Sequence, residues 1–385
     1  SLVVLGAAIR LLDTRNNRYL YVGVLALALA FGTKELALVS LAVWIGALAL
    51  LFDRRLFVAR ELGNSWVGTA RSMFARTYRG LWRFRLPLFV GVVEFLAIIV
   101  VLYAPRPDLF RAFADPTGLP AVLGAATIGS AEKLIDLWIQ GGHEHSYIAY
   151  LTDAVLTTAH VSLPLVGFAV LGFLSDRYTG ESPRDLVSFA FYWGIAIFLI
   201  YPAITDISAP WGLVHALVPL SIPAAVGLGL VLERGYAAWN RADRVGIAIA
   251  GLVVFAVVAQ VGLTAVETTY RSPQAAENPL VQYGQPGGHL QETLVEIESI
   301  ARENEGTDVV FYGDHFAVPL ESIADDPPAS SNWLNRLPLA WYLERAGAST
   351  DSAKSPEGIE GDPPVVIARV EHYSELADRL GRDLD

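Results

Sequence analysis

A lysine and a glutamate stand together where two apolar runs meet. The run from Tyr19 to Phe31 ends at Gly32, and Lys34 and Glu35 precede the next run. Ionisable groups beside membrane-length segments are costly to place and are candidates for function, and a helix broken at that depth is tolerated where it lines a cavity. Lys34, a compact point charge, suits a lipid phosphate. The alternative is a Lys–Glu pair that reaches the interface from a helix end.

The densest polar cluster between apolar runs is His143-Glu144-His145, which follows two glycines. Two histidines with an adjacent acid suit a divalent metal, so His143 and His145 are candidate metal ligands, although no further ligand is identified. Contact of His143 and Glu144 with a polar substrate head group is favoured over metal binding. A solvated loop is the third. The cofactor is therefore open, with a divalent metal as one option.

Trp211 and His215 open a later apolar run. They are one helical turn apart, so both side chains face the same way on a helix. The pair would place an indole and an imidazole at the mouth of a cavity, although tryptophan is common at membrane interfaces in any case. Pro219 and Pro223 predict a bend in the same segment.

The segments that must position these residues are long and apolar. The chain is 53% hydrophobic and its mean hydropathy is +0.42, and about 17 to 25 apolar residues cross a bilayer core of about 30 Å. We predict about seven spans plus a truncated first one, at Leu2–Leu12, Tyr19–Phe31, Leu36–Phe52, Leu86–Ala104, Thr152–Leu174, Leu186–Ile204, Trp211–Leu232 and Val245–Ala265.

Arginines gather in every second loop between these runs. The loop from Asp53 to Arg85 holds eight arginines against two acids, and three smaller groups follow the first, fifth and seventh runs. Basic loops stay in the cytosol, so we predict a multi-pass cell-membrane protein with these four loops inside. The junction at Lys34, the segment Pro105–Tyr150 and the chain after Ala265 then lie outside, and Leu119–Ile139 is a candidate interfacial helix.

Charge divides the chain near residue 266. From Val266 to Asp385 there are 22 acidic and 8 basic residues, a net charge of −14, whereas residues 1–265 carry +3. An acidic surface of this kind disfavours nucleic acid as a partner. Lysine is scarce beside arginine, which suggests a halophilic source. Cysteine is absent, which excludes disulfides, thiolate nucleophiles and cysteine-based metal sites.

The acidic tail has the pattern of a small α/β module. Apolar residues recur every three or four positions in Leu290–Glu303, which predicts a helix, and Asp314-His315 follow the first strand as a weak candidate site. The expected order is helix Leu290–Glu303, strand Val309–Tyr312, helix Trp333–Ala346, strand Pro364–Val370 and helix His372–Leu380.

The fold class is therefore a membrane α-helical bundle with a C-terminal extracytoplasmic α/β domain. We expect a polytopic domain at 1–265 and an acidic soluble domain at 266–385. The chain begins with Ser1 inside an apolar run and shows no basic n-region or cleavage site. We therefore expect it to be N-terminally incomplete.

Four motifs carry a family resemblance. They are Phe31-Gly32-Thr33-Lys34-Glu35, Pro210-Trp211 with His215 and Pro219, the segment Glu277–Tyr283, and the segment Leu337–Leu343. Together they resemble the archaeal flippase activity-associated membrane proteins, which are similar to the dolichyl-phosphate-mannose–protein mannosyltransferases of the GT-C type.

The resemblance implies a polyprenyl- or dolichyl-phosphate sugar donor used at the outer face, with a glycan or protein acceptor, in cell-surface glycan assembly. It also implies an acidic residue in the first outer loop that serves as catalytic base or metal contact. That loop would precede residue 1, so the catalytic base is not identified. Gln140 and His143 are separated by two glycines with no arginine after them, which departs from the family's expected pattern.

Three functions remain open. The first is a glycosyltransferase that transfers a hexose such as mannose, with Lys34 on the phosphate and His143, Glu144 and His215 beside the acceptor. The second is a non-catalytic accessory to the flipping or transport of a lipid-linked glycan. The third is a scaffold whose outer module recruits partners.

Overall fold

The computed structural model describes residues 1–33, 37–61, 63, 65–135, 146–179, 183–205, 209–275, 277–281, 288, 290–318 and 331–381. The contacts within the chain define two compact units, Ser1–Val261 and Gly262–Asp385. The first is built of helices, and the second holds a small sheet.

Six described helical segments are long enough and apolar enough to cross a membrane, and they contain α3, α5, α9, α10, α11 and α12. The shorter α2 is also apolar, so the predicted helical membrane bundle is confirmed. The helices are α1 (Leu2–Thr14), α2 (Arg18–Thr33), α3 (Ala37–Glu61), α4 (Trp66–Arg83), α5 (Arg85–Tyr103), α6 (Arg106–Ala114), α7 (Leu119–Gly124), α8 (Ser130–Ile135), α9 (Tyr147–Tyr178), α10 (Asp185–Ile204), α11 (Val214–Asn240) and α12 (Arg244–Val266).

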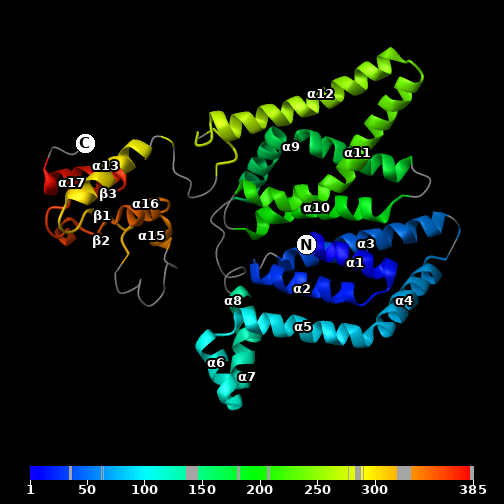
Figure 1. The fold of residues 1–385 in the computed structure, drawn as a ribbon, viewed down its shortest axis with the longest axis horizontal. Coiled ribbons are helices and arrows are strands. Elements are labelled where there is room, and N and C mark those ends of the chain that lie inside the picture. The colour runs from blue at the N-terminus through cyan, green and yellow to red at the C-terminus, as the bar shows by residue number, and fades with distance from the viewer. Residues whose placement is uncertain are drawn as a thin grey trace. The chain divides into compact units, whose positions relative to one another are not determined.

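Helices α9, α10 and α11 pack side by side, and α3 lies against α10 (Figure 1). The α9–α11 contact depends on two glycines. A Cβ atom on Gly172 would lie 2.0 Å from the carbonyl oxygen of Pro223, and one on Gly227 would lie 2.1 Å from that of Phe168. Lipid chains are as apolar as leucine, so membrane helices associate through close backbone packing of this kind.

Helix α9 is kinked in its middle, at Ser162 (φ −138°, ψ 15°), next to Pro164. Proline has no N–H to bond the carbonyl four residues earlier, which is that of His160. Gln260 of α12 supplies the donor instead, since its Nε2 lies 3.0 Å from the His160 oxygen. The side chain of Gln260 in α12 thus replaces the backbone hydrogen bond that α9 lacks at its kink.

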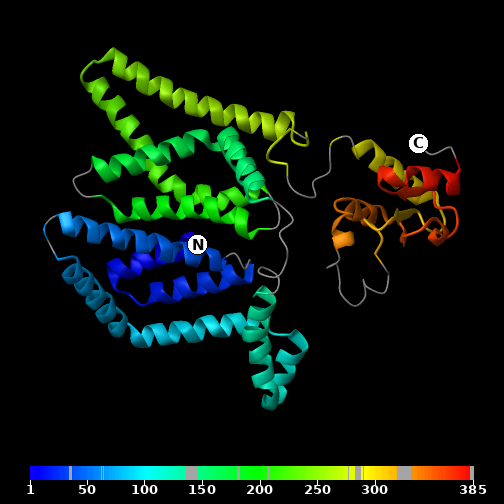
Figure 2. The ribbon, with the colours of Figure 1, turned by 180° about the vertical axis from the view of Figure 1, so that it is seen from behind.

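The turns that carry the arginines lie at one end of this unit. The turns after α1, α3, α9 and α11 share that end, and the ends of α2, α5 and α10 share the other (Figures 1 and 2). An ion pair between Arg55 and Asp185 joins α3 to α10 at the first end. At the second end, the Tyr147 hydroxyl donates to the Leu199 carbonyl over 3.0 Å. The assignment of the first end to the cytosol stays a prediction.

The arginine-rich segment after α3 is mostly helical, where the sequence analysis expected a loop. Helix α3 continues to Glu61, and Gly63 (φ +74°) makes the turn. Ser65 then caps α4 by accepting a hydrogen bond from the backbone N–H of Gly68 over 3.3 Å. The density of arginines concealed the helical spacing of the apolar residues between them.

The segment after α5 is also helical. Besides α6, it contains α7, a π-helical turn at Ala125–Gly129 and α8, which together run from Leu119 to Ile135. The predicted interfacial helix Leu119–Ile139 is therefore helical over its described part. Its last four residues lie outside the described residues.

The second unit is a three-stranded parallel sheet in the order β2-β1-β3, made of β1 (Val309–Tyr312), β2 (Thr350–Ala353) and β3 (Val365–Ile367). Helices α13 (Leu290–Glu303) and α16 (Leu339–Ala346) cover the face that holds Val309 and Phe311. Helix α17 (Tyr373–Leu380) covers the face that holds Val310 and Tyr312. The central strand β1 is buried on both faces, as parallel sheets require.

The elements of the second unit follow the prediction with two differences. The expected helix Trp333–Ala346 is divided into α15 (Ser331–Leu334) and α16, because Pro338 cannot continue a helix from the preceding turn. Strand β2 was not predicted, since Thr350-Asp351-Ser352-Ala353 lacks the apolar residues that indicate a strand. It forms by pairing with β1.

Candidate functional site

The membrane unit contains a cavity between α1, α2, α3 and the start of α11, with a volume of about 270 Å³. Most of its walls are aliphatic, and a few hydroxyl, indole and imidazole groups interrupt them. Such a lining suits an apolar ligand held by a few polar contacts. The lining residues are Ser1, Val4, Leu27, Ala30, Thr33, Ala37, Ser40, Leu41, Trp44 and His215.

The end of α2 that borders the cavity is fixed by α5. The hydroxyl of Tyr103 donates to the carbonyl of Phe31 over 2.6 Å. Gly32 lies against Leu102, whose Cδ1 would be 2.5 Å from a Cβ at that position. These contacts hold the last turn of α2, and Thr33 follows them directly at the cavity wall.

Lys34 and Glu35 lie outside the described residues, but the residues on both sides of them line the cavity. Thr33 precedes Lys34 directly, and Ala37 follows two residues after Glu35. The described part of the predicted junction, Phe31 to Thr33, therefore ends at this cavity. The contacts of its two charged side chains stay a prediction.

His215 lines the same cavity from the first turn of α11. Its imidazole ring lies 5.5 Å from the ring of Tyr201 in α10. Trp211, the predicted partner, lies in the 3-10 turn Pro210–Leu213 just before α11. The structure thus places one predicted residue, His215, in the wall of the cavity. It also shows an aromatic neighbour, Tyr201, that the sequence analysis did not identify.

Trp44 is the indole of the cavity wall. Its ring meets those of Trp193 and Phe189 of α10 edge to face, with centroids 5.2 and 5.9 Å apart. Its Nε1 is buried, and no described residue accepts a hydrogen bond from it. A buried N–H without an acceptor costs about 1–3 kcal/mol, and the edge-to-face contacts with α10 hold the indole in place despite that cost.

The predicted metal cluster cannot be placed. His143, Glu144 and His145 lie outside the described residues. Within the described ranges, no group of three or more histidines, aspartates or glutamates is close enough to hold a metal ion. The roles assigned to these three residues stay predictions.

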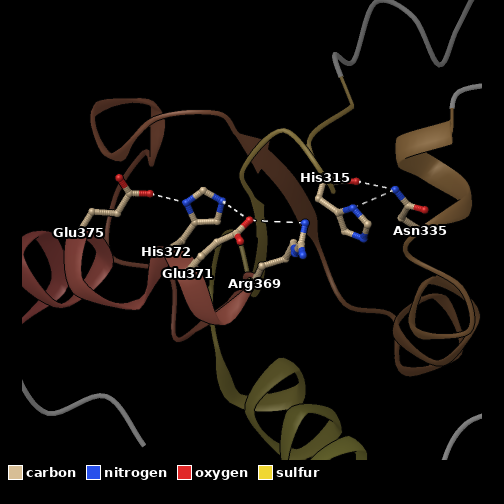
Figure 3. Close-up of polar contacts among 6 residues, drawn as sticks. All are labelled: His315, Asn335, Arg369, Glu371, His372 and Glu375. Atoms are coloured by element: carbon tan, nitrogen blue, oxygen red, sulfur yellow. Dashed lines mark hydrogen bonds and ion pairs between the residues drawn. The ribbon is translucent and has the colours of Figure 1, made fainter.

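A second polar cluster lies in the α/β unit, beyond the carboxyl end of β1. The Tyr312 hydroxyl donates to Glu375 over 3.0 Å, and the same carboxylate lies 2.6 Å from Nδ1 of His372 (Figure 3). Burial, together with the hydrogen bond to Glu375, raises the pKa of Tyr312 to about 12. Gly313 (φ +87°) allows the close approach, since a Cβ there would lie 2.8 Å from His372 Nε2.

The predicted Asp314-His315 pair does not act as one unit. Asp314 pairs with Lys354 over 3.5 Å and is well exposed. His315 instead contacts Asn335, whose Nδ2 donates to the His315 carbonyl over 3.0 Å (Figure 3). The two side chains have separate partners, which suits a fixed loop better than a catalytic pair.

A buried arginine organises the other face of this unit, and sequence reasoning missed it. Arg336 is 5% exposed, and its guanidinium donates to the Phe316 carbonyl and the Ser352 hydroxyl over 2.8 and 2.5 Å. It also lies 4.3 Å from the centre of the Phe311 ring. Burial lowers its pKa. Its position directly before the Leu337–Leu343 motif was the one available signal.

The fold thus defines a multi-pass helical membrane unit joined in sequence to a small parallel α/β unit. Residues 290–383, which hold the sheet and its helices, match the family model of the Agl23 flippase-associated protein C-terminal domain. No curated protein and no solved structure matches the chain.

The match contains one of the four motifs that carry the family resemblance. The Leu337–Leu343 segment lies inside it, whereas Glu277–Tyr283 precedes it. In the latter, Asn278 has a structural role. Its side-chain amide donates to the carbonyls of Thr268 and Ser272 over 3.0 and 2.9 Å, and its Oδ1 accepts from the N–H of Leu280.

Proposed function

We propose that this chain handles a polyprenyl-phosphate-linked sugar at the membrane during the assembly of cell-surface glycans. One observation carries the proposal: residues 290–383 match a domain described as flippase-associated, and the rest of the chain is a membrane bundle with an apolar cavity. A substrate with a lipid tail and a polar head requires both kinds of environment.

The cavity between α1, α2 and α3 is the proposed site for the head end of the lipid. Its volume of about 270 Å³ is at the lower limit of ligand pockets, which span about 300–1,000 Å³. It therefore suits the phosphate and the first isoprene unit rather than the whole chain. Lys34, which follows Thr33 of the wall directly in the sequence, supplies the positive charge for the phosphate.

Sugar transfer is the first form of this function. Breaking the bond between sugar and phosphate needs a cation or donor at the departing phosphate and a base that removes the acceptor's proton. In this proposal Lys34 serves the phosphate, and His143, Glu144 and His215 lie beside a glycan or protein acceptor. Glu35 orients the lysine. The base itself is not assigned.

A non-catalytic role in moving or presenting the lipid-linked glycan is the second form. The words that describe the matching domain, flippase-associated, favour it. It uses the same cavity and the same phosphate contact, but no acceptor base. The two forms therefore share the binding step and differ in whether sugar leaves the lipid.

The orientation of the chain belongs to the same proposal. Four arginine-bearing turns in the cytosol would place the cavity end of α2, and the acidic unit after α12, outside the cell. Protease shaving of intact cells should then remove an epitope tag at the C-terminus and spare one inserted between α3 and α4. The reverse pattern would overturn this orientation.

The test uses the full chain in proteoliposomes with a radiolabelled polyprenyl-phosphate mannose. Lys34→Ala and His215→Ala should each weaken binding of the lipid, by about tenfold or more for the lysine because it loses a charge-assisted contact. Lys133→Ala and His160→Ala are matched controls in α8 and α9, and they should bind normally.

The fate of the radiolabelled sugar distinguishes sugar transfer from the non-catalytic role. Transfer to a glycan or peptide acceptor by wild type, and its loss in Lys34→Ala, supports the enzyme. Binding without transfer, together with faster passage of the lipid between leaflets, supports the accessory. Equal binding by wild type and Lys34→Ala would remove the cavity from the proposal.

A further inference from the structure

Helix α4 shows an apolar face that the described residues of the chain leave exposed. Trp66, Phe74, Tyr78 and Leu81 fall on one side at helical spacing, and each is more than half exposed. Only Phe74 has a described aromatic neighbour on another helix, Phe52 of α3, with ring centroids 5.5 Å apart. An apolar face of this extent is unfavourable in water, so it is expected to contact lipid or another protein.

The opposite side of α4 is basic. Arg76, Arg79 and Arg83 project there, and Arg71 lies at the border between the two faces. No acidic residue occurs from Trp66 to Arg85. In the part of the chain that the structure describes, no carboxylate pairs with these arginines. Their contacts are local, such as that from Arg79 Nε to the Ala75 carbonyl over 3.2 Å.

We propose that α4 lies in the membrane interface and binds the head groups of anionic phospholipids. A helix with aromatic and aliphatic residues on one face and arginines on the other is stable in the plane of the interface. Each basic residue near an anionic surface contributes attraction that salt screens. Zwitterionic lipid would cover the apolar face equally well but would leave the arginines without counter-charges.

The connections of α4 support this position over a spanning one. It joins α3 to α5, two helices that cross the membrane, and it runs obliquely to both (Figures 1 and 2). A spanning α4 would carry four arginines through the hydrocarbon, which is costly. Helix α12, which is almost wholly apolar and buries none of its residues, shows by contrast the composition of a candidate span in this chain.

The first experiment measures lipid preference with the purified full chain. Phosphatidylglycerol, titrated into detergent micelles, should raise the melting temperature more than phosphatidylcholine does. In Arg76→Gln/Arg83→Gln, the amount of phosphatidylglycerol that gives half the effect should rise on the order of 30-fold. Arg106→Gln/Arg111→Gln, which removes two arginines at the other end of the unit, should behave as wild type.

Two results would overturn the lipid assignment. One is an unchanged phosphatidylglycerol effect in Arg76→Gln/Arg83→Gln. The other is an equal effect of inorganic phosphate at the same concentration, which would indicate a soluble anion site. A preference that disappears in 0.5 M NaCl, with the melting temperature in phosphatidylcholine unchanged, supports the proposal.

The second experiment measures depth, and it works even if the arginine variants fold poorly. The chain has no cysteine, so Phe74→Cys and Arg79→Cys each give one site for an environment-sensitive fluorophore. In phosphatidylcholine–phosphatidylglycerol vesicles, the label at 74 should be quenched by lipids with a nitroxide near the head group and the label at 79 by aqueous iodide. Iodide quenching of the labels at both positions would overturn the proposal.

Discussion

Helix α12 and strand β1 are both almost wholly apolar, yet the structure treats them in opposite ways. Phe255 of α12 is 70% exposed, and the helix buries none of its residues. Phe311 of β1 is 1% exposed, and all four residues of the strand are buried. The same residue type is therefore exposed on a candidate membrane span in one unit and is a core residue in the other.

The difference shows what holds each unit together. The sheet unit gains stability by removing Val, Phe and Tyr side chains from water. The helical unit gains little in that way, because lipid already surrounds its apolar residues. It depends on close backbone contacts such as Gly172 against Pro223, and on single hydrogen bonds such as Gln260 to His160.

The largest expected effect comes from alanine substitutions at the two phenylalanines, Phe311 and Phe255, which test this contrast directly. Phe311→Ala should destabilise the α/β unit by about 3–5 kcal/mol, since it leaves a cavity beside Arg336 and Leu343. Phe255→Ala should change the stability of the membrane unit by only about 0.5 kcal/mol. Hydrogen exchange of the peptides that contain β1 and α12, in the full chain, measures both. A similar loss at both positions would mean that α12 is covered by protein.

The next effect concerns the glycines. Gly227→Ala places a methyl group about where the Phe168 carbonyl stands and should cost about 1–3 kcal/mol through overpacking. Gly229→Ala, on the same helix, meets nothing within 4 Å and should stabilise by up to about 1 kcal/mol. Melting temperatures in detergent test the pair, and a shift of the same sign in both would contradict the packing argument.

Much of the fold could be predicted because its signals are local. The spans follow from uninterrupted apolar runs, and β1 and α13 have the predicted bounds because their apolar spacing is strict. Strand β2 could not be predicted, since its residues are polar and its strand state comes from pairing with β1. Helix α4 was missed for another reason: its arginines were interpreted only as a topological signal.

The candidate site could be predicted only in part. His215 was found because an imidazole at the start of an apolar run is unusual. Trp44 and Tyr201 were not, because an aromatic residue within a span carries no local sign that it borders a cavity, as Trp44 does, or contacts a residue of the cavity wall, as Tyr201 contacts His215. Their role depends on which helices meet, and that is decided by contacts far apart in the sequence, such as α3 against α10.

A smaller expected effect is the pH dependence of the stability that the Tyr312–Glu375 hydrogen bond gives the α/β unit. Tyr312→Phe removes the hydrogen bond to Glu375 and should cost about 1–2 kcal/mol at pH 8. Because the folded pKa of Tyr312 is raised to about 12 from an ordinary 10, the contribution of its neutral hydroxyl is complete below pH 10 and is lost as the pH rises to 12. The difference between wild type and variant should therefore shrink over that range.

The measurement is a urea midpoint read from a fluorophore on Val370→Cys, a position that is 93% exposed, in both backgrounds. Tyr373→Phe, an exposed tyrosine of the same unit, is the control and should run parallel to wild type at every pH. If the urea midpoints of wild type and Tyr312→Phe differed by a constant amount from pH 8 to 12, ionisation of Tyr312 would not be the cause of the pH dependence.

The smallest effect asks what one hydrogen bond is worth inside the membrane unit. Gln260→Leu leaves the His160 carbonyl without its side-chain donor and should cost about 0.6 kcal/mol, the average for such bonds between membrane helices. Pro164→Ala restores a backbone N–H that can bond the same carbonyl. In the Pro164→Ala background, Gln260→Leu should therefore cost almost nothing. A double-mutant cycle on melting temperatures gives the coupling. An equal cost of Gln260→Leu in both backgrounds would mean that the kink, and not the glutamine, determines how α9 meets α12.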